Sequence, residues 1–142
     1  YDGLTKDTLN NIRSTKEFVV NLVSEEIVEP MVECATDYDK EIDEFKISNL
    51  TPIDSDKISS PRVKESKVSY ECELNTIVEI GEAEPGAGFV VIGTIVMFHI
   101  QDDVYNDGRI DLKALNPIGR LAGNSYTRVF DNFKVIRKIK PD

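Results

Sequence analysis

Apolar and polar residues alternate through the middle of the chain. From Val68 to Ile80 the apolar side chains recur at every second position, apart from the intruding Ile77, and this period predicts one long strand. Residues 89–100 are apolar at almost every position, which predicts a second strand packed on both faces. The turn-rich stretch 81–88 joins the two. The pattern therefore predicts a long central hairpin in a mainly β fold with inserted short helices.

Two short elements precede this hairpin. Asp7 or Thr8 is expected to cap a helix that stops near residues 14–16. Residues 17–23 carry apolar side chains on both faces, which predicts a strand buried on both sides. Asn21 is the polar exception in this strand.

The segment that follows is helical in pattern. Ser24 is expected to cap a helix that either kinks at Pro30 or begins again just before it. Residues 43–50 predict a further short helix. Its buried side chains are expected to be Phe45, Ile47 and Leu50. The connection 51–66 is long for a compact domain, and such loops often serve a function or face a partner.

The last third of the chain predicts short β elements. Asn106–Gly108 is a strong turn signal, and residues 109–112 are expected to pair back as a short strand. Residues 117–126 are expected to form a glycine-containing loop, and residues 127–139 a terminal strand. The whole pattern predicts a β-barrel with short helices inserted after its early strands.

The net charge excludes two classes of partner. The 142 residues include 17 Lys and Arg and 26 Asp and Glu, which gives −9 at pH 7. Nucleic acid and anionic membranes both require a basic surface, so neither is expected as a partner. Most of the imbalance lies in residues 25–44, which hold nine acidic residues and one basic residue.

Metal and membrane chemistry are not expected either. Cys34 and Cys72 are far apart in sequence, and His99 is the only histidine, so no metal-ligand spacing is present. A membrane helix needs about 20 apolar residues, which the chain does not supply. Two lone thiols and no recognisable signal peptide favour a cytoplasmic location.

Two groups of residues are candidates for binding a planar, anionic ligand. Lys6, Asp7 and Thr8 lie at a helix start, where free N–H groups, an ammonium and a hydroxyl can hold a phosphate. Ordinary N-capping is the more common role for such residues. Arg120 lies in a glycine-containing loop followed by Tyr126, so the guanidinium could bind a phosphate while the phenol ring packs on a planar ring of the ligand. An ordinary loop with one core tyrosine fits the same residues equally well.

His99 is expected to point inward. With strict alternation it shares one face of its strand with Phe89, Val91, Gly93, Ile95 and Met97. A histidine in such a setting is more often part of the core than of a site.

The order and spacing of several segments resemble one family. The chain is similar to the flavin reductase-like FMN-binding proteins, which have a split β-barrel of Greek-key type. The similar segments are residues 6–12, 17–21, 43–45, 50–52, 61–66, 70–72, 93–102 and 117–126.

The resemblance implies a homodimer with FMN near the subunit interface and NAD(P)H as hydride donor. By the same resemblance, Lys6, Asp7 and Thr8 would lie at the phosphate, and Asn21 near the flavin or the dimer seam. The implied cofactor-binding set is completed by His99, Arg120 and Tyr126. Ala122 stands where a second glycine is common in the family. Catalytic residues are not identified.

The resemblance also implies that residues 1–142 are a single domain without the opening strands of the family pattern. Such strands supply much of the flavin contact in relatives. A barrel without them would leave exposed edges. We therefore expect this chain alone to bind flavin poorly and to associate readily.

Three functions follow from the sequence. The first is an FMN-binding oxidoreductase, a flavin reductase that uses NAD(P)H. The second keeps the fold but makes the protein a non-enzymatic FMN-binding electron carrier. The third is a flavin-free protein-interaction module that docks through the acidic residues 25–44.

Overall fold

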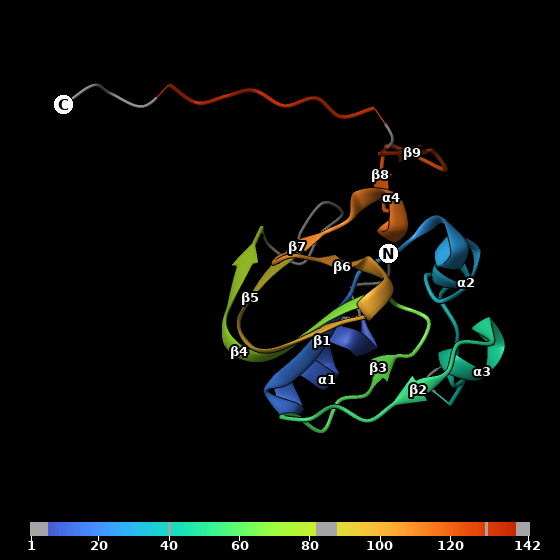
Figure 1. Cartoon of the computed structure of the whole chain (residues 1–142). Coiled ribbons are helices and arrows are strands. Elements are labelled where there is room, and N and C mark those ends of the chain that lie inside the picture. Colours follow the sequence, from blue (N-terminus) through green and yellow to red (C-terminus); the bar gives the residue numbers. More distant parts are fainter. Residues whose placement is uncertain (1–5, 40, 82–87, 130, 139–142) are drawn as a thin grey trace.

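Two long strands form the centre of the molecule (Figure 1). The computed structural model describes residues 6–39, 41–81, 88–129 and 131–138. β4 (Val68–Ile80) and β5 (Gly88–Ile100) pair antiparallel along their length, which confirms the predicted hairpin. β1 (Glu17–Asn21) pairs antiparallel with the other edge of β4 and ends at Asn21 rather than at residue 23. The resulting sheet has the order β1-β4-β5.

An extra residue in β5 changes which side chains share a face of this sheet. Glu71 pairs with Met97, whereas Cys72 pairs with Ile95, so Val96 between them is a β-bulge. Neighbouring residues of β4 point to opposite faces, and cross-strand partners share a face. Ile95 and Met97 therefore lie on opposite faces of the sheet.

The bulge sets the orientation of His99. The expectation that His99 shares a face with Ile95 is wrong, because the extra residue shifts the alternation between them. His99 instead pairs with Ser69 and lies on the face that carries Glu71. This face is buried near the base of the hairpin, where Ser69 is 1% and Glu71 0% exposed.

The first helix, α1 (Asp7–Thr15), begins directly after Lys6. The expected cap at Asp7 or Thr8 is wrong, because both lie inside the helix and no side chain caps its start. Asp7 lies in the first turn, where its carboxylate interacts favourably with the helix dipole. Lys16 ends the helix in a left-handed conformation with φ of 63°. The helix buries Leu9 and Ile12.

A short 3-10 turn and two short helices follow β1. η1 spans Glu25–Ile27 and α2 spans Val28–Glu33, so the helix begins again before Pro30, which was one of the two predicted arrangements. Ser24 precedes η1 as expected, but its hydroxyl makes no capping hydrogen bond.

α3 (Glu44–Ser48) lies within the predicted helix. It is capped by Asp43, whose carboxylate accepts a hydrogen bond of 3.1 Å from the Phe45 N–H. Ile47 is 40% exposed, so the expectation that it is buried is wrong. Ser48 takes the buried position of this helix.

The connection 51–66 folds back onto the sheet. β2 (Pro52–Ile53) and β3 (Arg62–Val63) pair with each other inside it. Between these strands, the chain hydrogen-bonds to Glu17 of β1 and Glu71 of β4. The connection is therefore held by carboxylates of the sheet.

The expected turn at Asn106–Gly108 is present. Asp107 and Gly108 have positive φ of 46° and 75°, as a tight hairpin turn requires. The flanking elements are η2 (Asp102–Val104), β6 (Tyr105–Asn106), β7 (Arg109–Ile110) and α4 (Leu112–Leu115).

The predictions for the C-terminal segment are partly wrong. β8 (Ile118–Arg120) pairs with β9 (Tyr126–Arg128), so the expected loop 117–126 contains the two sides of a hairpin. The predicted terminal strand stops at Arg128, and residues 131–138 form no strand. Figure 1 shows this segment extending away from the body, where no neighbouring strand of the described chain can pair with its backbone.

The hydrophobic core lies between the base of the hairpin and the C-terminal elements. Val68, Val104 and Leu115 are almost fully buried together. Leu22, Tyr70, Ile110 and Ala114 pack against them.

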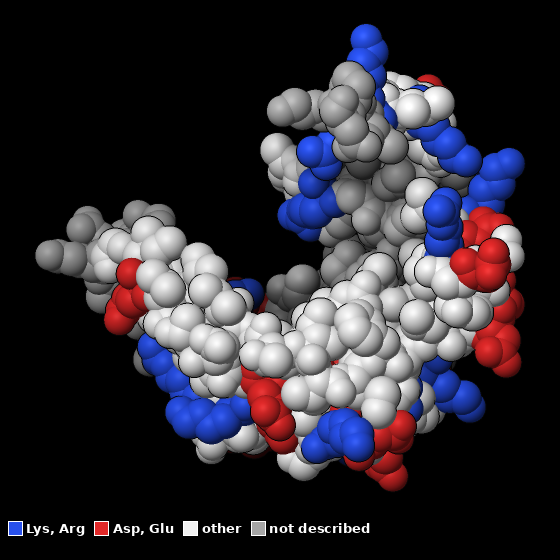
Figure 2. All heavy atoms as spheres, turned by 60° about the vertical axis from the view of Figure 1, so that its left-hand side comes forward, with Lys and Arg blue, Asp and Glu red and all other residues white. Residues whose placement is uncertain are grey.

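The distal half of the hairpin has an apolar face open to solvent. Its members share one face of the two strands, with Val78 paired to Val90, and each is between 45% and 54% exposed: Val78, Ile80, Val90 and Ile92. We call these four residues the distal apolar face. Figure 2 shows a broad, hollowed side of the molecule where uncharged residues predominate, with Lys and Arg gathered on its upper rim. Among the described residues, no helix is long and apolar enough to cross a bilayer.

Candidate functional site

A pocket lies between the start of α1 and the start of β5. It has a volume of about 270 Å³. Lys6 and Thr8 supply its polar side, and the first N–H groups of α1 have no partner inside the helix. The apolar side is formed by Leu9, Ile12, Gly88, Phe89 and Val91. Two of the predicted phosphate-binding residues therefore share one pocket.

The ammonium of Lys6 is only weakly held. It lies 3.6 Å from the carboxylate of Asp37, and the two side chains are 67% and 94% exposed. Exposed ion pairs of this kind contribute little free energy, so a stronger anionic ligand can displace Asp37. On the other side of the pocket, the guanidinium of Arg13 lies 4.9 Å from the ring centre of Phe89.

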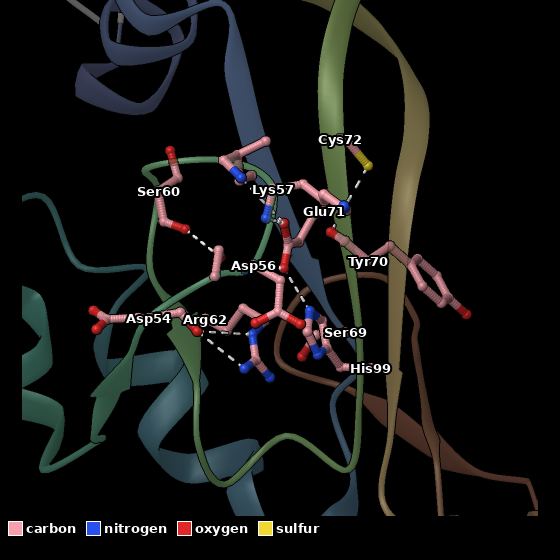
Figure 3. Close-up of polar contacts among 12 residues, drawn as sticks. Asp54, Asp56, Lys57, Ser60, Arg62, Ser69, Tyr70, Glu71, Cys72 and His99 are labelled. Atoms are coloured by element: carbon pink, nitrogen blue, oxygen red, sulfur yellow. Dashed lines mark hydrogen bonds and ion pairs between the residues drawn. The ribbon is translucent and has the colours of Figure 1, made fainter.

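His99 is held by a buried carboxylate. Its Nε2 lies 2.5 Å from Oε1 of Glu71, whose side chain is fully buried. The same carboxylate accepts hydrogen bonds from the backbone N–H groups of Asp56 at 2.7 Å, Lys57 at 2.7 Å and Ile58 at 3.2 Å. Figure 3 shows Glu71 between the loop and the imidazole. The loop, β4 and β5 therefore meet at one carboxylate.

These contacts keep Glu71 ionised. Burial alone would raise the pKa of its carboxyl group. The hydrogen bonds from the Asp56 N–H, the His99 ring and the Lys57 N–H outweigh burial and lower the pKa to about 2. The ionised carboxylate of Glu71 accepts a hydrogen bond from Nε2–H of His99.

A groove of about 420 Å³ opens beside His99. Its polar lining includes Arg62, Lys64, Lys67, His99 and Gln101. Its apolar lining includes Ile53, Phe98 and Ile100. Figure 3 shows Arg62 beside the loop, where its Nε and Nη2 donate to the carbonyl oxygen of Asp54 at 3.3 and 3.0 Å.

Asn21 joins three strands. Its side-chain oxygen accepts hydrogen bonds from the Val63 N–H at 3.1 Å and the Ser69 hydroxyl at 2.9 Å. The polar exception in β1 is therefore paired to β3 and β4, and its oxygen is already occupied.

Arg120 and Tyr126 contact each other. The guanidinium carbon lies 4.8 Å from the ring centre, and Nη1 donates to the phenol oxygen. Nη2 also donates to the carbonyl oxygen of Gly123 at 2.6 Å. The two predicted site residues are therefore close in space, but the guanidinium donates its hydrogen bonds within the β8–β9 hairpin.

Comparison with known proteins identifies the family of the chain. The family model described as a flavin reductase like domain matches residues 3–114. The chain belongs to this family. A solved structure with the same fold is that of nitrilotriacetate monooxygenase component B from Bacillus cereus, 36% identical, with a TM-score of 0.88 over 95% of this chain and 67% of that one.

Two further proteins are similar to the chain over most of its length. A Shewanella frigidimarina protein with a flavin-reductase split-barrel domain is 30% identical, with a TM-score of 0.81 over 92% of this chain and 65% of that one. A protein of Aquifex aeolicus is 36% identical over 94% of this chain and 66% of its own length. The predicted family and split-barrel fold are thus confirmed, and the chain spans about two thirds of the length of these relatives.

The flavin reductase-like chain does not gather all the predicted site residues in one place. Lys6 and Thr8 line the pocket at the start of β5, whereas His99 lines the groove at its other end. Val91 and Phe98, one from each lining, are separated by roughly 20 Å at about 3.3 Å per strand residue. Sequence reasoning missed Glu71 and Arg62 as neighbours of His99. Glu71 lies at the buried end of β4, where an acid needs a partner, but the sequence does not distinguish this end from the exposed one.

Proposed function

We propose that this flavin reductase-like protein binds FMN and transfers hydride from NAD(P)H to the flavin. The pocket at the start of α1 is the observation that carries the proposal. It combines an ammonium, a hydroxyl and helix N–H groups with an apolar wall, the chemistry that suits a phosphate attached to a less polar group.

The residues of the pocket fit one end of FMN. Lys6 and Thr8 would hold the phosphate, with Asp7 contributing through its backbone, because its carboxylate would repel the anion. The volume of about 270 Å³ lies below the usual range for ligand pockets, about 300–1,000 Å³. The remainder of the flavin would therefore extend beyond this pocket. When bound, the flavin supplies the hydride-accepting ring, while the protein binds and orients it.

A second copy of the chain is the proposed partner. The distal apolar face leaves Val78, Ile80, Val90 and Ile92 about half exposed, next to the start of β5. Burial of such side chains drives most association between proteins. A homodimer through this face would bring a second surface close to the pocket. His99, Asn21, Arg120 and Tyr126 keep their proposed flavin contacts only if such a surface reaches them.

The acidic segment supports the interaction-module hypothesis less well. Nε of Arg128 donates to Oε1 of Glu25 at 2.6 Å, and the ammonium of Lys67 lies 3.3 Å from Glu26. Two acidic residues of the segment are thus paired inside the chain. The free thiols of Cys34 and Cys72 support the proposed cytoplasmic location, because lone thiols persist in reducing compartments.

Flavin binding and turnover are tested separately. The chain is purified and titrated with FMN, and its flavin absorbance bands are recorded. Steady-state oxidation of NADH and NADPH is then measured with excess free FMN. Bound flavin with catalytic turnover supports the reductase. Bound flavin that NAD(P)H does not turn over supports the electron carrier. A chain that stays colourless with FMN, both alone and within its full-length protein, contradicts both.

A further inference from the structure

The groove beside His99 has an unusual charge for this chain. The whole molecule carries −9, yet none of the nine described residues that line the groove is acidic. Three of them are cationic: Arg62, Lys64 and Lys67. The lining of the groove therefore differs in charge from the molecule as a whole, which favours an anionic ligand.

Two of the three cations have capacity to bind. The ammonium of Lys67 is occupied by Glu26, Asp103 and the carbonyl oxygen of Ala114. Arg62 uses Nε and Nη2 for Asp54, and its Nη1 makes no hydrogen bond within the described part of the chain. Lys64 is exposed, and its ammonium has no ion-pair partner among the described residues.

The opposite wall of the groove suits a ring. Phe98 is 56% exposed, and its ring packs edge-on against Tyr70 at 5.1 Å between centres, so it is held at a fixed angle. Ile100 lies on the same face of β5 as Phe98 and extends this apolar wall, whereas Ile53 pairs with Arg62 on the cationic side of the groove. His99 lines the groove from the other face of β5, where Glu71 holds it. Because the Phe98 ring is already ordered, a ligand that packs on it loses little binding free energy to the ordering of this side chain.

We infer that this groove is a binding site for a small aromatic anion, separate from the proposed flavin phosphate pocket. The carboxylate or phosphate of the ligand binds Nη1 of Arg62 and the ammonium of Lys64. Its ring packs on Phe98. The site requires neither FMN nor NAD(P)H, so it stands or falls independently of the proposed function.

The test is calorimetric titration of the chain with three probes: benzoate, its neutral isostere benzamide, and inorganic pyrophosphate. Benzoate is expected to saturate one site per chain. Benzamide is expected to bind at least about tenfold more weakly, because it lacks the charge for a charge-assisted hydrogen bond. Tighter binding of pyrophosphate than of benzoate identifies a phosphate site and overturns the role given to Phe98.

Variants locate the site. Lys64→Gln is expected to weaken benzoate about tenfold, and Lys64→Arg to retain binding. Lys113→Gln, an exposed lysine of α4 outside the groove, is the matched control and should change nothing. Arg62→Gln should weaken benzoate further, and its thermal unfolding is recorded because Arg62 also holds Asp54.

Three results overturn the inference. They are the absence of saturable benzoate binding, equal affinities for benzoate and benzamide, and equal losses in Lys64→Gln and Lys113→Gln. Competition supplies a fourth: if FMN displaces benzoate stoichiometrically, the groove belongs to the flavin site and is not separate. Failure of FMN to bind at all leaves the benzoate result unaffected.

Discussion

The side chains of Glu71 and His99 bond across the β4–β5 pair, with Oε1 and Nε2 2.5 Å apart. Neither residue is the direct cross-strand partner of the other, since His99 pairs with Ser69 and Glu71 with Met97. The diagonal contact is possible because both lie on the same face of the sheet. Through the Glu71 carboxylate, the imidazole is connected to the loop between β2 and β3.

Glu71→Gln is expected to destabilise the protein by about 1–3 kcal/mol, because an amide cannot accept hydrogen bonds from four donors and leaves buried groups unpaired. Urea denaturation measures this loss. Hydrogen exchange at Asp56, Lys57 and Ile58 should also accelerate, since their N–H groups bond to this carboxylate. Glu73→Gln, an exposed acid of the same strand, is the control. Unchanged exchange at the three amides would contradict the anchoring role.

The contribution of Glu71 should depend on pH. Its pKa is about 2 in the folded chain, below the ordinary 4.5, so ionisation stabilises the fold above about pH 4.5. This stabilisation is lost as the pH falls toward 2, where the folded carboxyl group is protonated as well. The difference in unfolding free energy between wild type and Glu71→Gln should therefore shrink from pH 6 to pH 3, as urea denaturation can measure. A constant difference over that range would show that the pKa of Glu71 is not depressed.

Gly93→Ala is expected to destabilise the sheet. A Cβ at this position would lie 2.5 Å from Cζ and 2.7 Å from Cε1 of Phe18, which packs from β1. Overpacking of this kind typically costs about 1–3 kcal/mol. Thermal unfolding measures the cost, and Phe18→Leu in the same chain should recover part of it. At Gly88 a Cβ meets no described atom within 4 Å, so Gly88→Ala should be close to neutral.

Lys6→Gln should weaken FMN binding about tenfold and leave riboflavin binding almost unchanged, because riboflavin has no phosphate. Fluorescence titration with both flavins measures the two affinities. Lys46→Gln on α3, which lies outside the pocket, is the matched control. If Lys6→Gln weakened the binding of FMN and of riboflavin equally, the phosphate would not bind at the start of α1.

Val90→Lys should prevent self-association. The substitution places a charge in the middle of the distal apolar face, where Val90 pairs with Val78. Sedimentation velocity is expected to show a dimer for the wild-type chain and a monomer for the variant. Glu79→Lys, at an exposed position of β4 that points to the opposite face of the hairpin, should remain dimeric. If wild type is monomeric at high concentration, the homodimer proposal fails for this chain.

Local patterns predicted the elements that depend on local physics. The alternation of Val68–Ile80 located β4, and the Asn-Asp-Gly signal located the β6–β7 turn, because period and turn chemistry are readable from neighbouring residues. The family resemblance placed Lys6 and Thr8 at the phosphate end of a flavin site, and the structure brings them to one pocket.

Long-range relationships could not be read in this way. No local signal marks Val96 as a bulge, because the chain stays apolar on either side of it. The loop 54–60 carried many serines, but its partners Glu17 and Glu71 lie on other strands. Residues 127–139 were predicted as a terminal strand, yet a strand also needs a neighbour, and the described chain offers none to residues 131–138.

The bulge at Val96 has a consequence for changes of chain length. Deleting this single residue would leave Ile95 directly before Met97, and both could keep their partners Cys72 and Glu71. Phe98 and His99 would then keep their faces, and β5 would lose only the local bend. If the intact strand paired without the bulge, Phe98 would lie opposite Ser69 on the face of Glu71, and His99 would turn to the other face. One extra residue thus determines whether an imidazole or a benzene ring lies beside the buried carboxylate.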